Sequence, residues 1–253
     1  MRVLITRPLA QARPWVLALQ AQGIDAVALP LIRIAPLADT APLAGAWSAL
    51  AQQALVFFVS ANAVDHFFAL QPAGTAWPAG TLAAAPGPGT AAALRAHGVP
   101  QASIVAPGPQ APSFDSEAVW AQLQAHDWRG RSALIVRGEQ GRDWLAEQLK
   151  AAGAQARFLA AYRRQPPAPD ACGQQLLDAA RQDPAGHLWL FSSSEALRHL
   201  AALWPDGAPA GARALASHAR IAAAAREAGF VQVLEVAPSV DAVLAAIRAL
   251  PEA

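Results

Sequence analysis

The chain has 253 residues, and its 19 Lys+Arg against 18 Asp+Glu leave a formal net charge of +1. This balance argues against a nucleic-acid-binding protein, which usually carries a clear positive excess, so no nucleic-acid partner is expected. The single cysteine, Cys172, excludes an internal disulfide, and the sequence has no His/Cys cluster of the kind that holds a structural metal.

The apolar content does not indicate a membrane protein. Although 54% of the residues are nominally hydrophobic, alanine supplies a large part of that share. No strongly apolar stretch reaches the roughly 18 residues of a transmembrane helix. At the N-terminus, Arg7 and Pro8 follow an apolar run that is too short for a signal-peptide core. We therefore expect no membrane association and a cytoplasmic location.

Short apolar runs alternate with stretches rich in Ala, Leu, Gln and Arg along the whole chain. Strict alternation of strands and helices is typical of parallel sheets covered by helices on both faces. Ten strands are too many for one compact sheet in a chain of this size, which favours two α/β domains with five strands each. The expected strands are 3–6, 26–34, 55–59, 82–85, 104–106, 133–136, 156–162, 188–191, 214–216 and 231–236.

An internal repeat with a spacing of about 130 residues supports two domains. VLITRP leads to QAQGIDA in the first copy and ALIVRG leads to KAAGAQA in the second, so Arg7 corresponds to Arg137. Similarly, FFVSANAV matches LFSSSEAL, so Ser60 corresponds to Ser193. Alanine-rich composition alone could produce such likeness, but ordered agreement at positions other than alanine favours a duplication.

Proline-rich segments suggest a different partition from the repeat. Residues 34–42 and 163–171 each follow an expected strand, and extended proline-rich runs suit semi-rigid links between domains. We therefore predict a discontinuous first domain of 1–36 plus 170–253, with residues 40–162 inserted as a second domain. The expected linkers are about 37–39 and 163–169.

A glycine-rich turn, APGPGTAA, follows the strand at 82–85 and opens a helix. Its glycines let a ligand approach the backbone, and the free N–H groups of a first helical turn favour an anion. Thr90 either adds a hydroxyl donor or caps the helix. A dinucleotide site is disfavoured, because no acid closes the next strand and Pro86 and Pro88 each lack an amide donor.

Hydroxyl groups stand where two further strands pass into helices. Ser60 and Ala61 follow the strand at 55–59, and Ser192 and Ser193 follow the strand at 188–191. Serine is a common helix cap. Donors at the carboxyl ends of parallel strands also line the crevice where such sheets bind ligands. Both roles can hold at once.

Arginine dominates the basic residues, and only Lys150 is lysine. A guanidinium binds carboxylates with two parallel hydrogen bonds, so arginines at strand ends suit an anionic small molecule. Any one of them could instead form a surface salt bridge. The arginines at strand or helix ends are Arg7, Arg137, Arg163, Arg164 and Arg220.

The only tyrosine, Tyr162, ends a strand directly before the second proline-rich segment. It either packs against that segment or acts as a proton donor. The sequence contains no Gly-x-Ser-x-Gly elbow and no evident Ser/His/Asp set or carboxylate pair. Elaborate acid–base machinery is therefore not expected.

Taken together, these pieces resemble the uroporphyrinogen-III synthase family over essentially the whole chain. The matching segments are ITRP, FFVSANAV, APGPGTAAALRAHG, SALIVRGEQGRDWLAEQLKAAGA, AYRR, LFSSSEAL and SHARIAAAAREAGF. The resemblance implies two flavodoxin-like (Rossmann-like) parallel-sheet domains, joined by a two-stranded linker, with the substrate in the cleft between them.

The resemblance also implies a cyclising lyase of tetrapyrrole (heme) biosynthesis. Its members close linear hydroxymethylbilane into uroporphyrinogen III through a spiro intermediate, with loss of water and inversion of the terminal pyrrole ring. We expect a monomer without a cofactor or metal. Because the pyrroles are electron-rich, the enzyme mainly has to orient the substrate, which fits the scarcity of acid–base residues.

Site residues can be carried over position by position. Tyr162 matches the family's tyrosine that assists loss of the hydroxyl, Thr90 matches its cleft threonine, and Ser60 and Ser193 match its serines. In place of a second Gly-x-x-Thr turn the chain has SHARI, in which Ile221 cannot donate a hydrogen bond. Either His218 and Arg220 take over carboxylate binding there, or backbone amides act alone. Whether Arg7 and Arg137 are functional or structural stays open.

Two other functions fit parts of the pattern. A bilobed binding protein for an anionic metabolite would share the fold and the arginines. A nucleotide-dependent transferase would use two Rossmann-like halves, but it lacks the expected ribose-binding acid and has prolines in its glycine turn.

Overall fold

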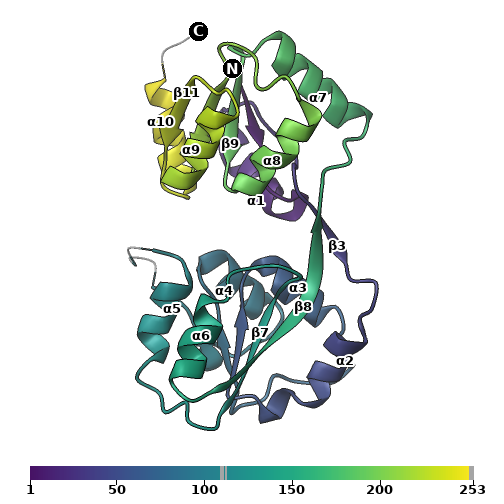
Figure 1. Ribbon diagram of the computed structural model, residues 1–253, viewed down its shortest axis with the longest axis vertical. Coiled ribbons are helices and arrows are strands. Elements are labelled where there is room, and N and C mark those ends of the chain that lie inside the picture. Colours follow the sequence, from purple (N-terminus) through teal and green to yellow (C-terminus); the bar gives the residue numbers. More distant parts are fainter. Residues whose placement is uncertain (109–110, 112, 251–253) are drawn as a thin grey trace. The chain divides into compact units, whose positions relative to one another are not determined.

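The computed structural model describes residues 1–108, 111 and 113–250, and it contains two parallel sheets flanked by helices (Figure 1). The chain divides into two compact units, Met1–Arg33 with Gln165–Ala253 (unit 1) and Ile34–Arg164 (unit 2). The predicted α/β class with parallel sheets is confirmed. The change of unit at 33/34 and 164/165 places residues 37–39 and 163–164, expected as linkers, within unit 2.

Unit 1 has a five-stranded sheet in the order β11-β10-β9-β1-β2, and all its described pairings are parallel. This is the flavodoxin order, in which the chain winds outward in both directions from β1 and β9. The elements are β1 (Arg2–Ile5), α1 (Leu9–Gln20), β2 (Ala26–Ala28), α7 (Ala171–Gln182), β9 (His187–Phe191), α8 (Ser194–Leu203), β10 (Arg213–Ala216), α9 (Ala219–Glu227), β11 (Gln232–Glu235) and α10 (Val240–Ala249).

Unit 2 has a six-stranded sheet in the order β3-β8-β7-β4-β5-β6. Its elements are β3 (Arg33–Pro36), α2 (Ala41–Ser48), β4 (Leu55–Phe58), α3 (Ala61–Phe68), β5 (Leu82–Ala84), α4 (Pro88–Ala96), β6 (Ile104–Val105), α5 (Ser116–Leu123), β7 (Ser132–Gly138), α6 (Trp144–Ala151) and β8 (Gln155–Gln165), with short 3-10 helices η1 (Leu50–Gln52) and η2 (Gln101–Ser103).

Two expected strand boundaries are wrong. The run 26–34 was expected as one strand, but β2 ends at Ala28 and β3 starts at Arg33, in the other sheet. Pro30 lies between them, and proline has no N–H to donate to a sheet. Strand β8 continues to Gln165, so the first residues of the expected second linker are strand.

The internal repeat and the two units do not coincide. The first repeat supplies β1-α1-β2 to unit 1 and β4-α3-β5-α4-β6 to unit 2, and the second repeat does the reverse with β7-α6-β8 and β9-α8-β10-α9-β11. The repeat-matched Gly23 and Gly153 both take left-handed backbone after α1 and α6, with φ of 77° and 93°. Each sheet is therefore assembled from both copies, through the pairings β1–β9 and β4–β7.

Several helices start at side chains that accept a backbone N–H, as the capping rule expects. This arrangement fixes where a helix begins after a strand or loop. The capping residues are Ser60, Asp115, Asp170, Ser193, His218 and Ser239.

Both faces of the unit 2 sheet are covered. On the α3 face, Leu134 and Val136 of β7 pack with residues of α2, α3 and α4. On the α6 face, Ala133 and Ile135 of the same strand pack with residues of α5 and α6. This alternation decides which functional side chains can meet.

The division into units predicts how fragments behave. Residues 34–164 produced alone should fold, because they hold both covered faces of one sheet, and their urea unfolding should show one cooperative transition by circular dichroism. The control is residues 1–128, cut at the repeat boundary, which should lack a cooperative transition because β4 loses its partner β7. A cooperative 1–128 with an unfolded 34–164 would contradict this division.

Candidate functional site

The predicted site residues lie at the carboxyl edges of the two sheets. In unit 2, Ser60 follows β4 and Thr90 lies just after β5. In unit 1, Arg7 follows β1, Ser192 follows β9 and His218 follows β10. Parallel α/β sheets bind ligands at this edge, beside the point where the winding direction changes. That point lies between β7 and β4 in unit 2 and between β1 and β9 in unit 1.

Tyr162 and Ser60 are brought together, although they lie far apart in the sequence. The Tyr162 hydroxyl lies 3.2 Å from the Ser60 Oγ, and either oxygen can donate. Ser60 also caps α3 by accepting the Ala63 N–H at 3.3 Å. The residue Tyr162 is 1% exposed and belongs to the α3-face core. The two hydroxyls therefore form a pair beside the carboxyl ends of β4 and β7, anchored by the N-terminus of α3.

His66 lies against the same tyrosine, although the sequence patterns did not single it out as a site residue. Its ring and that of Tyr162 are stacked with centroids 5.8 Å apart and an interplanar angle of 28°. Burial lowers the pKa of His66, and the neighbouring Asp65 carboxylate opposes that shift. The sequence feature that could have indicated His66 is its correspondence with His199 in the other repeat.

Thr90 does not cap its helix, contrary to one of the two expectations. Gly87 is the N-cap of α4, with an extended backbone, and Thr90 lies buried in the first turn at 7% exposure. A Cβ at Gly87 would meet the Phe114 Cβ at 3.2 Å, so the glycine allows a close approach of these two segments. Ala61 is the first residue of α3, where its backbone N–H belongs to the first turn.

The serines after β9 have a structural role that is visible in the geometry. Ser193 caps α8 by accepting the Glu195 N–H at 3.1 Å, and Ser192 is half-buried beside it. The Oγ of Ser194 is buried and has no hydrogen-bond partner among the described residues. The capping role of Ser193 is thus confirmed, and its contact with a ligand stays a prediction.

The repeat-equivalent arginines differ in their surroundings. The Arg137 Nη1 donates to Asp143 Oδ1 at 2.5 Å and to the Gly141 carbonyl at 3.1 Å, and its guanidinium lies 3.8 Å from the Phe158 ring centroid. Because Val136 belongs to the α3 face, Arg137 points to the α6 face, opposite Tyr162. The Arg137 guanidinium is therefore already hydrogen-bonded within the protein, and it lies on the opposite face of the sheet from Tyr162.

Arg7, by contrast, has no acidic partner among the described residues. Its guanidinium lies 4.5 Å from the Trp15 ring centroid, and its buried Nε lacks a hydrogen-bond partner in the described part of the chain. Burial lowers the pKa of Arg7. A bound carboxylate would offset the cost of burying this charge.

The segment that departs from the family pattern has a clear local structure. His218 caps α9, with its Nδ1 accepting the Arg220 N–H at 3.1 Å, and both side chains belong to exposed residues. Ile221 is 5% exposed and fills the core beneath the first turn of α9. His218 thus caps α9 at the position where Gly87 begins the equivalent helix α4, and Arg220 is left at the surface.

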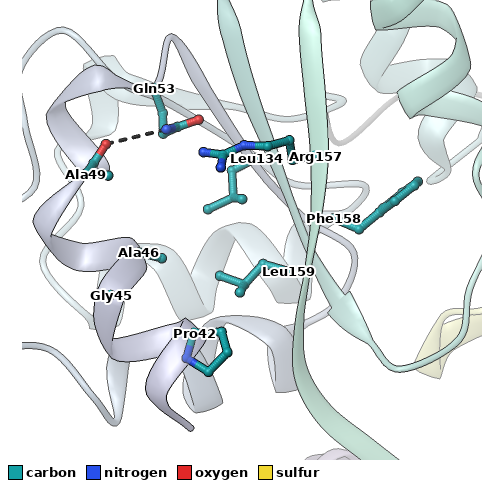
Figure 2. Close-up of a pocket in the computed structure, with 9 residues that line it drawn as sticks. All are labelled: Pro42, Gly45, Ala46, Ala49, Gln53, Leu134, Arg157, Phe158 and Leu159. Atoms are coloured by element: carbon teal, nitrogen blue, oxygen red, sulfur yellow. Dashed lines mark hydrogen bonds between the residues drawn. The ribbon is translucent and has the colours of Figure 1, made fainter.

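A cavity in unit 2 is formed by residues other than the predicted site residues. The cavity has a volume of about 270 Å³ and lies between α2 and the sheet. Figure 2 shows Leu134 and Leu159 on its sheet side and the Gln53 amide bonded to the Ala49 carbonyl. Within the described residues, no group of His, Cys, Asp and Glu could hold a metal ion, and no helix has the length and apolarity to cross a bilayer.

Comparison with known proteins gives the same family by several routes. The model of the uroporphyrinogen-III synthase HemD family (HEM4) matches residues 14–245. Uroporphyrinogen-III synthase of Salmonella typhimurium LT2 is 36% identical over 168 residues, and that of Escherichia coli K12 is 32% identical over 165. Each match spans 65% of this chain and 65% of the relative's length.

Solved structures are similar in fold. A mutant uroporphyrinogen III synthase from the extremely thermophilic bacterium Thermus thermophilus aligns with a TM-score of 0.59 and 19% identity, covering 98% of this chain and 97% of that one. The synthetase from Helicobacter pylori 26695 aligns with a TM-score of 0.56 and 15% identity, covering 99% and 100%. Because the family model spans most of the sequence, the chain belongs to the uroporphyrinogen-III synthase family.

Proposed function

We propose that the protein is a uroporphyrinogen-III synthase, a lyase that cyclises hydroxymethylbilane to uroporphyrinogen III. The observation that carries this beyond family membership is the contact between the Tyr162 and Ser60 hydroxyls at the carboxyl edge of a parallel sheet. We further propose a monomer that acts in the cytoplasm, in tetrapyrrole biosynthesis, without a cofactor.

The reaction requires assistance to one leaving group, the terminal hydroxyl, and control of the geometry of the substrate. The terminal C–O bond of the substrate breaks, the hydroxyl takes up a proton and leaves as water, and a protonated azafulvene cation remains. Tyr162 supplies a hydrogen bond to that leaving hydroxyl, and Ser60 orients the phenol O–H. The substituted carbon of the terminal pyrrole then attacks to form the spiro intermediate. Its rearrangement and the loss of a proton from carbon complete the inverted macrocycle.

Carboxylate recognition falls to the other predicted residues. Arg7 offers a guanidinium without an acidic partner among the described residues, which suits a carboxylate of the substrate. Further donors are proposed at helix starts, where backbone N–H groups lie in the turns that hold Ala61, Thr90 and Ser193. His218 and Arg220, at the start of α9, are proposed as donors as well. Of the predicted substrate-binding residues, Arg137 is the least suited to bind a carboxylate, because its guanidinium already donates a hydrogen bond to Asp143.

Product analysis tests the activity directly. Purified protein supplied with enzymatically made hydroxymethylbilane should give uroporphyrinogen III, seen as the type III isomer of uroporphyrin after oxidation. A binding protein for an anionic metabolite would give only the type I isomer, formed at the spontaneous rate. That result would contradict the proposed activity.

Removing the phenol oxygen tests the proposed proton donor. Tyr162→Phe should lower kcat about 100-fold, since a positioned general acid contributes at least that factor, with folding intact by circular dichroism. Ser60→Ala is the matched hydroxyl deletion and should cost less, because Tyr162 keeps its own O–H. Equal turnover of Tyr162→Phe and the unaltered protein would remove Tyr162 from the mechanism.

The two repeat-equivalent arginines provide a matched pair for substrate binding. Arg7→Gln should raise KM about tenfold, because a charged hydrogen bond to carboxylate is lost while the chemical step is untouched. Arg137→Gln should leave KM near its original value, since its guanidinium is engaged by Asp143. Steady-state kinetics decide, and a larger rise in KM for Arg137→Gln would reverse the assignment.

A further inference from the structure

The ring of Tyr162 lies against two residues to which the proposed reaction gives no role. We infer that Gly138 and His66 are positioning residues, which form a slot that holds the Tyr162 ring so that its hydroxyl meets Ser60. This inference rests on the proposed function for its catalytic meaning. The slot is defined by packing contacts alone, so it can be tested separately.

A β-bulge in β8 turns the Tyr162 side chain to the α3 face of the sheet. Strands β7 and β8 pair regularly up to Arg137 and Ala160, and Gly138 then pairs with Tyr162 across a register shift. Ala161 packs on the α3 face, so strict alternation would turn Tyr162 to the α6 face. The extra residue in β8 lets Tyr162 join Ala161 on the α3 face, where Ser60 begins α3.

Gly138 makes room for the redirected ring. A Cβ at this position would lie 3.1 Å from Tyr162 Cε2 and 3.3 Å from Cζ, the carbon that bears the hydroxyl. Gly138 is not among the glycines with positive φ, so its backbone does not require glycine. The missing side chain is therefore needed for space against Tyr162, at the atom next to the reactive oxygen.

His66 bounds the ring from α3. Its stacked imidazole and the Ser60 Oγ come from the same helix and its cap, so one rigid element contacts both the ring and the hydroxyl. The equivalent His199 in the other repeat acts differently, with Nδ1 placed 2.7 Å from the Leu31 carbonyl. The stacking is thus a feature of the unit that carries the tyrosine.

Kinetics test the positioning role with controls from the same chain. Gly138→Ala and His66→Ala should each lower kcat about tenfold or more while KM stays within about twofold, because the Tyr162 hydroxyl is displaced and substrate binding is unchanged. His66→Phe keeps a flat ring and should restore most of kcat. Gly45→Ala, in open space on α2, and His199→Ala are the controls and should keep kcat.

A readout that does not depend on activity uses the fact that Tyr162 is the only tyrosine. In protein labelled with ring-13C tyrosine, all signals come from Tyr162, and their line shapes report how fast its ring flips. Flipping should be faster in His66→Ala, near the original rate in His66→Phe, changed in Gly138→Ala, and unchanged in Gly45→Ala and His199→Ala. Because His66→Ala and His66→Phe remove no backbone contact, they keep the test open should Gly138→Ala fail to fold.

The outcomes separate this inference from the proposed function. Unchanged ring flipping in both His66→Ala and Gly138→Ala would overturn the slot, whatever the activity. Altered flipping with unchanged kcat would overturn the positioning role. Altered flipping and a lower kcat would support both, whereas full turnover of Tyr162→Phe would refute the proposed catalytic tyrosine and leave the slot standing.

Discussion

Strands from different repeats pair at the centre of each sheet, and this pairing determines the course of the chain. Pairing of β1 with β9 and of β4 with β7 builds each central sheet from both copies of the duplicated sequence. The chain must therefore pass between the units twice, once through β3 and once through β8. Tyr162 lies on β8 shortly before the second passage, and the bulge there sets the direction of its side chain. Placement of the proposed proton donor thus follows from the topology.

Positions that correspond in the two repeats carry different chemistry. Arg7 and Arg137 follow the same pattern, yet only Arg137 has acquired a carboxylate partner among the described residues. Thr90 and Ile221 are both buried in the first turn of equivalent helices, but only the threonine retains a hydroxyl. The two edges differ, with a phenol–serine pair in unit 2 and, among the described residues, an arginine without an acidic partner in unit 1.

Much of this arrangement could be predicted from the sequence, because alternating strands and helices, the repeat and the strand-end hydroxyls are local patterns. The fold class and the capping by Ser60 and Ser193 follow from them. The engagement of Arg137 could not be predicted, because the face to which it points depends on strand pairing. The contact of Tyr162 with Ser60 and the role of Gly138 were equally hidden, since both depend on one register shift in β8.

In the proposed mechanism, the chain orients a tetrapyrrole through a fixed tyrosine hydroxyl and performs little other chemistry. Tyr162 is almost fully covered, so its hydroxyl must become accessible when the ligand is bound. A crystal structure of the protein with uroporphyrinogen III tests this most directly. We expect the Tyr162 hydroxyl within hydrogen-bonding reach, about 3 Å, of the macrocycle or of an ordered water that contacts it. A product bound elsewhere, with Tyr162 still covered by protein, would contradict it.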